Sequence, residues 1–139
     1  MSASSASFVL DSSALLALIE DEEGASRVEE VIRTSTVVIP AAVLMELFYI
    51  LRQERGEAEA YQFYAQTREV ADEVVWKLDE ATLLTAGRFK ADHQVSLADA
   101  WIAATAGQRG ALLLHKDPEF EALRDEIRME ALPFKAPRA

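Results

Sequence analysis

The sequence predicts an α/β protein with a mainly parallel sheet and helices on both faces of that sheet. Three short apolar runs, residues 8–10, 36–39 and 112–114, have the length and composition of buried strands. Segments with a helical spacing of apolar residues separate these runs, and strands that alternate with helices form parallel sheets. With 139 residues, half of them hydrophobic, the chain is long enough to bury a core as a single domain over residues 1–139.

Asp11 lies between the first predicted strand and the helix that follows it. The apolar run 8–10 ends at Asp11, which two serines follow at once. Ser12 or Ser13 can cap a helix whose apolar residues continue to position 19. An acidic stretch and Gly24 then end that helix.

The second predicted strand leads into a long helix. A helix over residues 26–33 precedes the β-branched strand 36–39, which Pro40 stops. Pro40 is also well placed at the entry to a helix that continues through Leu51. Gly56 breaks this helix.

The second half of the chain continues the alternation. Asp79 and Ser96 are predicted to cap helices, and Gly107 and Gly110 mark the end of the second of these. The remaining elements are helices over 57–68, 80–93 and 96–107, strands over 74–76, 112–114 and 129–132, and a short helical stretch after Pro118.

Composition and charge narrow the class of function. A formal net charge of −10 argues against a protein that coats DNA by bulk electrostatics. The absence of cysteine excludes disulfides and thiolate metal sites. No apolar stretch is long enough for a signal segment or a membrane span, so we expect a cytoplasmic protein without a membrane partner. The polar residues 1–7 are expected to be disordered.

Four acids are predicted to converge at one edge of the sheet. Asp11 ends the first strand, and Asp117 comes just after the strand 112–114. Glu46 lies near the start of the helix after the second strand, and Asp99 lies in the first turn of the helix that Ser96 begins. Ligands of such sheets bind beyond the carboxyl ends of the strands, where the strand order reverses.

Each acid also has a purely structural interpretation. Asp11 can cap the helix that follows it. Ser96 and Asp99 have the spacing of a capping box, and Asp117 stands in a turn before proline, where acids are common. Glu46 is harder to explain in this way, because an acid in the apolar middle of a helix is seldom buried without a partner.

Electrostatics favours a metal ion if the four acids do meet. Four ionised carboxylates about 5 Å apart would repel by about 3 kcal/mol per pair at an effective dielectric constant of about 20. Either some of them hold protons or a divalent cation compensates their charge. Oxygen ligands favour Mg²⁺ or Mn²⁺, and a chain with no cysteine and two histidines argues against zinc.

The segments that carry the acids are similar to known motifs. Taken in order, they resemble the four acidic motifs of the PIN domain family, and the length of the chain resembles the VapC-type toxins of type II toxin–antitoxin pairs. The likeness spans residues 8 to about 133. The four segments are FVLDSS at 8–13, VLMEL at 43–47, SLADAWIAATA at 96–106 and LLHKDPEF at 113–120.

The resemblance implies a three-layer α/β/α sandwich and a metal-dependent endoribonuclease that uses Mg²⁺ or Mn²⁺. It implies that Asp11, Glu46, Asp99 and Asp117 are the catalytic, metal-binding quartet, in which a metal-activated water cleaves RNA phosphodiester bonds. Ser13 and Glu119 match supporting positions. It also implies an RNA substrate, a cognate antitoxin and a homodimer. The alternative is a non-catalytic PIN-like module for protein interaction, whose acids merely cap helices.

Two further sets of residues are candidates for contacts with these partners. Basic residues near the predicted site could bind RNA phosphates, although each could equally be a solvated surface charge. Surplus apolar residues in the first half could form a groove for an antitoxin segment, with core packing as the alternative. The basic residues are Lys116, Arg52, Arg55, Arg88 and Lys90, and the apolar residues are Leu15, Leu18, Leu44, Leu47, Ile50 and Leu51.

Overall fold

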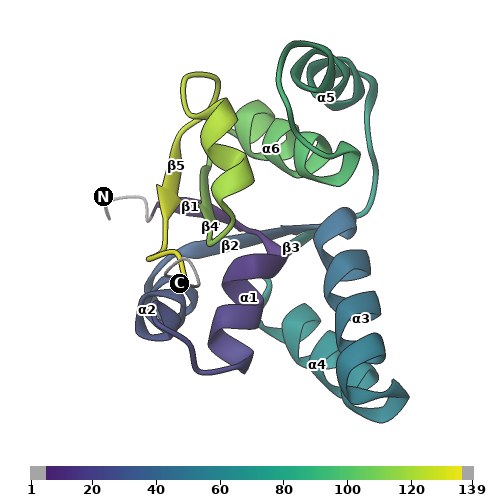
Figure 1. Cartoon of the computed structure of the whole chain (residues 1–139), viewed down its shortest axis with the longest axis vertical. Helices are drawn as coiled ribbons and strands as arrows, with labels where there is room; N and C mark the ends of the chain where they lie inside the picture. The colour runs from purple at the N-terminus through teal and green to yellow at the C-terminus, as the bar shows by residue number, and fades with distance from the viewer. Residues whose placement is uncertain (1–5, 136–139) are drawn as a thin grey trace.

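The computed structural model describes residues 6–135, which form a five-stranded parallel sheet covered by helices (Figure 1). The strands are β1 Ser7–Leu10, β2 Thr36–Pro40, β3 Glu73–Val75, β4 Leu112–His115 and β5 Met129–Ala131. The helices are α1 Ser12–Ile19, α2 Ala25–Thr34, α3 Ala41–Arg55, α4 Glu57–Val70, α5 Glu80–Asp92, α6 Leu97–Arg109 and the 3₁₀ helix η1 Pro118–Leu123.

The strand order places the reversal point of the sheet beside Asp11. The order is β3-β2-β1-β4-β5, and every neighbouring pair is parallel. The chain moves outward from β1 through β2 to β3, and then crosses back to place β4 on the other side of β1. The carboxyl ends of β1 and β4 therefore flank the switch point, where open parallel sheets bind their ligands.

The helices cover both faces of the sheet, which confirms the predicted three-layer α/β/α architecture. In Figure 1, α5 and α6 lie above the sheet, and α1, α2, α3 and α4 lie below it. The central strands are buried on both faces, which explains why they read as continuous apolar runs in the sequence. The largest wholly enclosed side chains include Leu10, Ile39, Leu113 and Leu114 of these strands.

The structure refines the predicted start of α1 and of the ordered chain. The N-cap of α1 is Asp11, whose carboxylate accepts the N–H of Ser13, so neither Ser12 nor Ser13 is the cap. Ser7, expected to be disordered, is the first residue of β1. Residues 1–5 lie outside the described residues.

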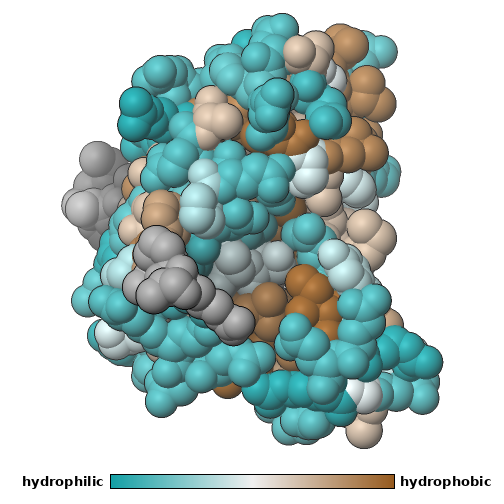
Figure 2. Space-filling view, in the orientation of Figure 1, coloured by the Kyte–Doolittle hydropathy of each residue, from teal (hydrophilic) through white to brown (hydrophobic). Residues whose placement is uncertain are grey.

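Figure 2 shows mainly hydrophilic residues on the face in view, with hydrophobic surface between α1 and α3 and over α5. Leu83 and Leu84 of α5 are two of the exposed apolar side chains. Within residues 6–135, every helix is too short or too polar to cross a membrane.

Gly24 should be essential for the turn before α2. Its φ of +101° is unfavourable for any L side chain, and an added Cβ would lie 3.1 Å from Cβ of Leu132. We expect Gly24→Ala to lower the free energy of unfolding by about 1–2 kcal/mol. Urea denaturation measures this change.

Gly87→Ala is the matched control for this substitution. Gly87 lies inside α5, and an added Cβ would meet nothing within 4 Å. The control should therefore raise the free energy of unfolding by about 0.5–1 kcal/mol, because alanine favours the helix. Equal effects of the two substitutions would contradict the assigned role of Gly24.

Candidate metal centre

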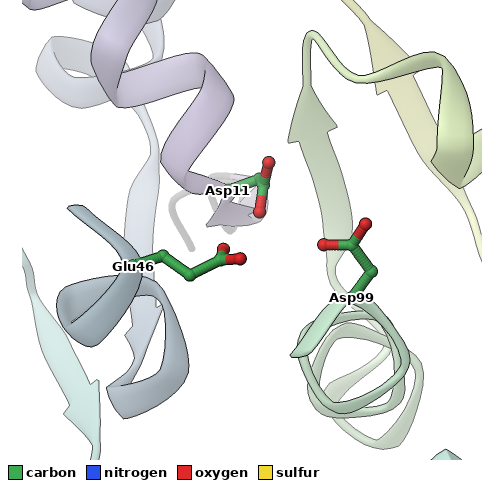
Figure 3. A group of neighbouring side chains, drawn as sticks. All are labelled: Asp11, Glu46 and Asp99. Atoms are coloured by element: carbon green, nitrogen blue, oxygen red, sulfur yellow. The ribbon is translucent and has the colours of Figure 1, made fainter. Parts of the chain in front are cut away.

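The structure brings the four predicted acids and Glu119 into one cluster of carboxylates, which we call the acidic pocket. Carboxylate oxygens of Asp11, Glu46 and Asp99 lie within 4.8 Å of one another, and so do those of Asp99, Asp117 and Glu119. Asp99 belongs to both groups and joins them. Figure 3 shows the side chains of Asp11, Glu46 and Asp99 converging from the end of β1, from α3 and from α6.

Asp11 uses only one of its two carboxylate oxygens for the helix cap. Its Oδ2 accepts the N–H of Ser13 at 3.0 Å and the hydroxyl of Ser13 at 2.5 Å. Its Oδ1 is buried and has no hydrogen-bond partner among residues 6–135. A buried, unpaired carboxylate oxygen is costly unless a ligand satisfies it. Asp11 therefore caps the helix as predicted, but this role explains only its Oδ2 and not its buried Oδ1.

Ser13 connects the ends of the two central strands. Its hydroxyl donates to Asp11 and accepts the backbone N–H of Lys116 at 2.8 Å. The backbone N–H of Asp11 in turn donates to the carbonyl of Leu114 at 3.0 Å. These bonds fix Asp11 relative to the segment that leads from β4 to Asp117.

Ser12 holds Glu46 toward the pocket, a contact that was not predicted from the sequence. Glu46 lies in the second turn of α3, where it is half-buried. The hydroxyl of Ser12 donates to Oε1 of Glu46 at 3.0 Å. The two serines directly after Asp11 were the feature of the sequence that could have revealed this contact. The hydroxyl of Ser13 orients Asp11, and that of Ser12 orients Glu46.

The predicted capping box at the start of α6 is only half formed. Ser96 is the N-cap, and its hydroxyl accepts the N–H of Asp99 at 3.1 Å. The reciprocal bond is missing, because the carboxylate of Glu119 accepts the N–H of Ser96 in place of Asp99. The Asp99 side chain is 5% exposed, and no residue in the described part of the chain donates a hydrogen bond to its carboxylate. The carboxylate of Asp99 is therefore available to bind a ligand in the pocket.

Asp117 ends the turn that follows β4, and Glu119 lies in the first turn of η1. Asp117 caps η1, with its Oδ1 accepting the N–H of Glu119 at 3.0 Å. Both the turn interpretation and the pocket interpretation of Asp117 therefore hold. Glu119 has a second contact that the sequence did not reveal, since Ser96 is 23 residues away along the chain.

Burial and mutual repulsion keep protons on this cluster. Burial, with the charges of Asp11 and Glu119, raises the pKa of Asp99 to about 8. Burial raises the pKa of Asp11 to about 6 against the opposing hydrogen bonds from Ser13, and burial also raises the pKa of Glu46. A divalent cation would reverse this preference by displacing the protons. The oxygen-only donor set and the unpaired Oδ1 of Asp11 fit Mg²⁺ or Mn²⁺.

Four of the five predicted RNA-binding cations are paired with acids of this chain, among them Lys116, whose Nζ lies 3.5 Å from a carboxylate oxygen of Glu22. The Lys116 side chain is 6% exposed, and its ammonium donates to the carbonyl of Glu23 at 2.8 Å. Ion pairs join Arg52 to Glu57 at 3.4 Å, Arg55 to Glu20 at 3.0 Å and Arg88 to Glu126 at 2.8 Å. Lys90 is an exposed residue of α5. A role in RNA binding stays a prediction for all five.

The fold and the pocket define an α/β protein with an acidic centre at the switch point of a parallel sheet. The model of the PIN domain family matches residues 8–126, and the chain belongs to that family. The predicted resemblance to the PIN domain family is thereby confirmed. A search of curated proteins found no match to the chain.

Solved structures with this fold include toxin–antitoxin proteins. VapBC2 from Rickettsia felis, bound to a DNA fragment from its promoter, has a TM-score of 0.74 and 13% identity, covering 91% of this chain and 99% of that one. DNA-bound VapBC from Salmonella typhimurium has a TM-score of 0.72 and 21% identity, covering 91% and 98%. Mycobacterium tuberculosis VapC20, a sarcin-ricin loop cleaving toxin, has a TM-score of 0.68 and 19% identity, covering 83% and 93%.

The raised pKa of Asp99 predicts a stability that falls with pH in the metal-free protein. The folded state holds this proton more tightly than the unfolded state, so stability is lost as the pH rises through about 8. Between pH 7 and pH 9 the free energy of unfolding should fall by about 1 kcal/mol. Urea denaturation in the presence of a chelator measures it.

Asp99→Asn provides the control for this pH dependence. The amide cannot ionise, so the variant should lose most of the slope between pH 7 and pH 9 and should be more stable than wild type at pH 9. An unchanged slope in the variant would show that another group titrates in this range.

Proposed function

We propose that this protein is a Mg²⁺- or Mn²⁺-dependent endoribonuclease and the toxin of a toxin–antitoxin pair. The observation that carries the proposal is the meeting of five carboxylates from β1, α3, α6 and the turn after β4, with one buried oxygen of Asp11 unpaired. Membership of the PIN domain family supports it, and so does the similarity in fold to VapC20, a toxin that cleaves the sarcin-ricin loop.

Each residue of the quartet has a role in this proposal. Asp11, Glu46, Asp99 and Asp117 would hold the metal, and Ser13 orients Asp11 through its two hydrogen bonds. A divalent cation in such a site activates water and offsets the charge that grows on the scissile phosphate. Glu119 supports the pocket by fixing the first turn of α6, on which Asp99 lies.

A cleft beside the acids supports access for an RNA strand. It has a volume of about 510 Å³, and its lining includes Ser13, Lys116, Pro118 and Phe134. The lining also contains acids, and the predicted basic contacts are already paired with carboxylates. Because the chain carries a net charge of −10, we infer that the metal supplies much of the attraction for the phosphates. Lys116, Arg52, Arg55 and Arg88 are proposed to exchange their partners for RNA phosphates.

Cleavage of RNA in the presence of Mn²⁺ is the experiment that tests this function. The wild-type protein should cut a mixed RNA substrate, and Asp99→Asn should cut it at least about a hundredfold more slowly, because a metal ligand is lost. A time course of fragment formation on a denaturing gel measures the rate. Added chelator should abolish cleavage by the wild type.

Asp125→Asn is the matched control, since it removes the same charge from an exposed position. It should cleave RNA at the wild-type rate. If the Asp99 variant cleaves as fast as this control, the acids only cap helices. The non-catalytic interaction module would then be the better interpretation.

The cognate antitoxin of this proposal has a candidate groove. Apolar side chains of α1, α2 and α4 line a depression of about 320 Å³. Of the surplus apolar residues, Leu15 and Leu18 line this groove, although Leu15 also belongs to the core. The remaining four do not line it: Leu44, Leu47 and Leu51 are buried in the core, and Ile50 is half-buried on α3. VapBC complexes share this fold, so we propose that a helix or strand of an antitoxin covers the groove.

Val70→Arg tests the antitoxin groove. Val70 is 38% exposed at the end of α4 and lines the groove, so a charge there should weaken binding of the co-expressed neighbouring small protein by at least about tenfold. Leu84→Arg on α5, outside the groove, is the control and should bind as the wild type does. Calorimetric titration measures both. Equal weakening would place the interface elsewhere.

The proposal includes a homodimer. A second apolar groove lies between α3 and α4, and Met45, Tyr61 and Trp76 at its edge are more than half exposed. Exposed apolar side chains that gather in this way are typical of surfaces that a protein partner covers. Sedimentation velocity of the isolated chain should show a dimer, and Trp76→Glu should shift it toward a monomer.

A further inference from the structure

His115, the last residue of β4, is a wholly buried polar group that the proposed chemistry does not use. Its side chain is 0% exposed. Its ring centroid lies 5.1 Å from that of Phe120 and 6.0 Å from that of Phe134. Its Nδ1 lies 3.2 Å from the backbone nitrogen of Asp117, which donates a hydrogen bond to it.

This hydrogen bond fixes the position of the imidazole proton. A backbone N–H can only donate, so Nδ1 must be the unprotonated nitrogen and the proton lies on Nε2. Nε2 is buried and has no hydrogen-bond partner in the described part of the chain. A buried donor without a partner is unfavourable, and a phenylalanine would fill the same space without that cost. The one polar contact that the ring does make is therefore the feature that needs explaining.

We propose that His115 is a positioning residue for Asp117. Its Nδ1 holds the backbone amide of Asp117, while the hydroxyl of Ser13 holds the preceding amide of Lys116. Two successive amides of the turn are thus anchored, and the Asp117 carboxylate is presented beside Asp99. The inference rests on the proposed function, in which Asp117 is a metal ligand.

Two substitutions of similar shape distinguish the effect of the hydrogen-bond acceptor from the effect of the aromatic ring. His115→Asn keeps an oxygen acceptor at the position of Nδ1, whereas His115→Leu has the same branched shape without an acceptor. We expect the leucine variant to bind Mn²⁺ about tenfold more weakly, as is typical when the partner of a metal ligand is lost. The asparagine variant should bind close to wild type. Calorimetric titration of metal-free protein with Mn²⁺ alone measures this, after circular dichroism has shown that each variant is folded.

His115→Phe is the second test, because it keeps the aromatic ring and removes the acceptor. A role in packing alone would make the phenylalanine variant the mildest of the three. The positioning role requires it to lose Mn²⁺ affinity about as much as the leucine variant does. Wild-type affinity in the leucine or phenylalanine variant, or equal loss in the asparagine variant, would overturn the proposal.

Amide hydrogen exchange at Asp117 tests the positioning role of His115 without any metal. In the metal-free protein this amide should exchange about fivefold faster in the leucine and phenylalanine variants than in wild type. In the asparagine variant it should exchange at nearly the wild-type rate. Equal exchange in all four proteins rules out the positioning role. If the wild type binds no Mn²⁺ but the exchange rates differ as expected, the metal-dependent function fails and the positioning of Asp117 stands.

Discussion

The repulsion among buried carboxylates at the switch point of the sheet is the constraint on which the rest of the site depends. Asp11, Glu46 and Asp99 place oxygens within 4.8 Å of one another, and Asp11 and Asp99 are almost wholly buried. Burial and like charge raise the pKa of Asp99 to about 8 and that of Asp11 to about 6, so the metal-free pocket is partly protonated at neutral pH. In the proposed function, a bound divalent cation would replace these protons.

The hydrogen bonds that cap α1 and α6 leave carboxylate oxygens of Asp11 and Asp99 available to bind a ligand. Asp11 caps α1 with one oxygen, and its other oxygen has no hydrogen-bond partner among residues 6–135. Glu119 accepts the Ser96 amide and so releases Asp99 from its expected capping bond. Asp11 at the start of α1 and Asp99 in the first turn of α6 also lie at the positive ends of helix dipoles, which partly offsets the cost of burying their charge. Stability and site geometry are therefore set by the same contacts.

The surface charge of the protein separates it from nucleic-acid binders that rely on basic patches. The basic residues around the cleft are already paired with acids, and the net charge is −10. In the proposed function, the attraction for a phosphate backbone is concentrated at the acidic pocket, where a bound cation would change the sign of the local field. Such a protein would bind RNA weakly without metal, and only where the strand reaches the pocket.

The α/β class, the order of the elements and the acids that follow β1 and β4 could all be predicted from the amino-acid sequence. Apolar runs such as 8–10 and 112–114 predict strands because both faces of a parallel sheet are buried, and that property is local to the residues. The hydrogen bonds that the acids make could not be predicted in this way. The contacts from Ser12 to Glu46, from Ser96 to Glu119 and from Lys116 to Ser13 join residues that lie 34, 23 and 103 positions apart. No local pattern encodes them, because each depends on how the helices and turns are placed around the ends of β1 and β4.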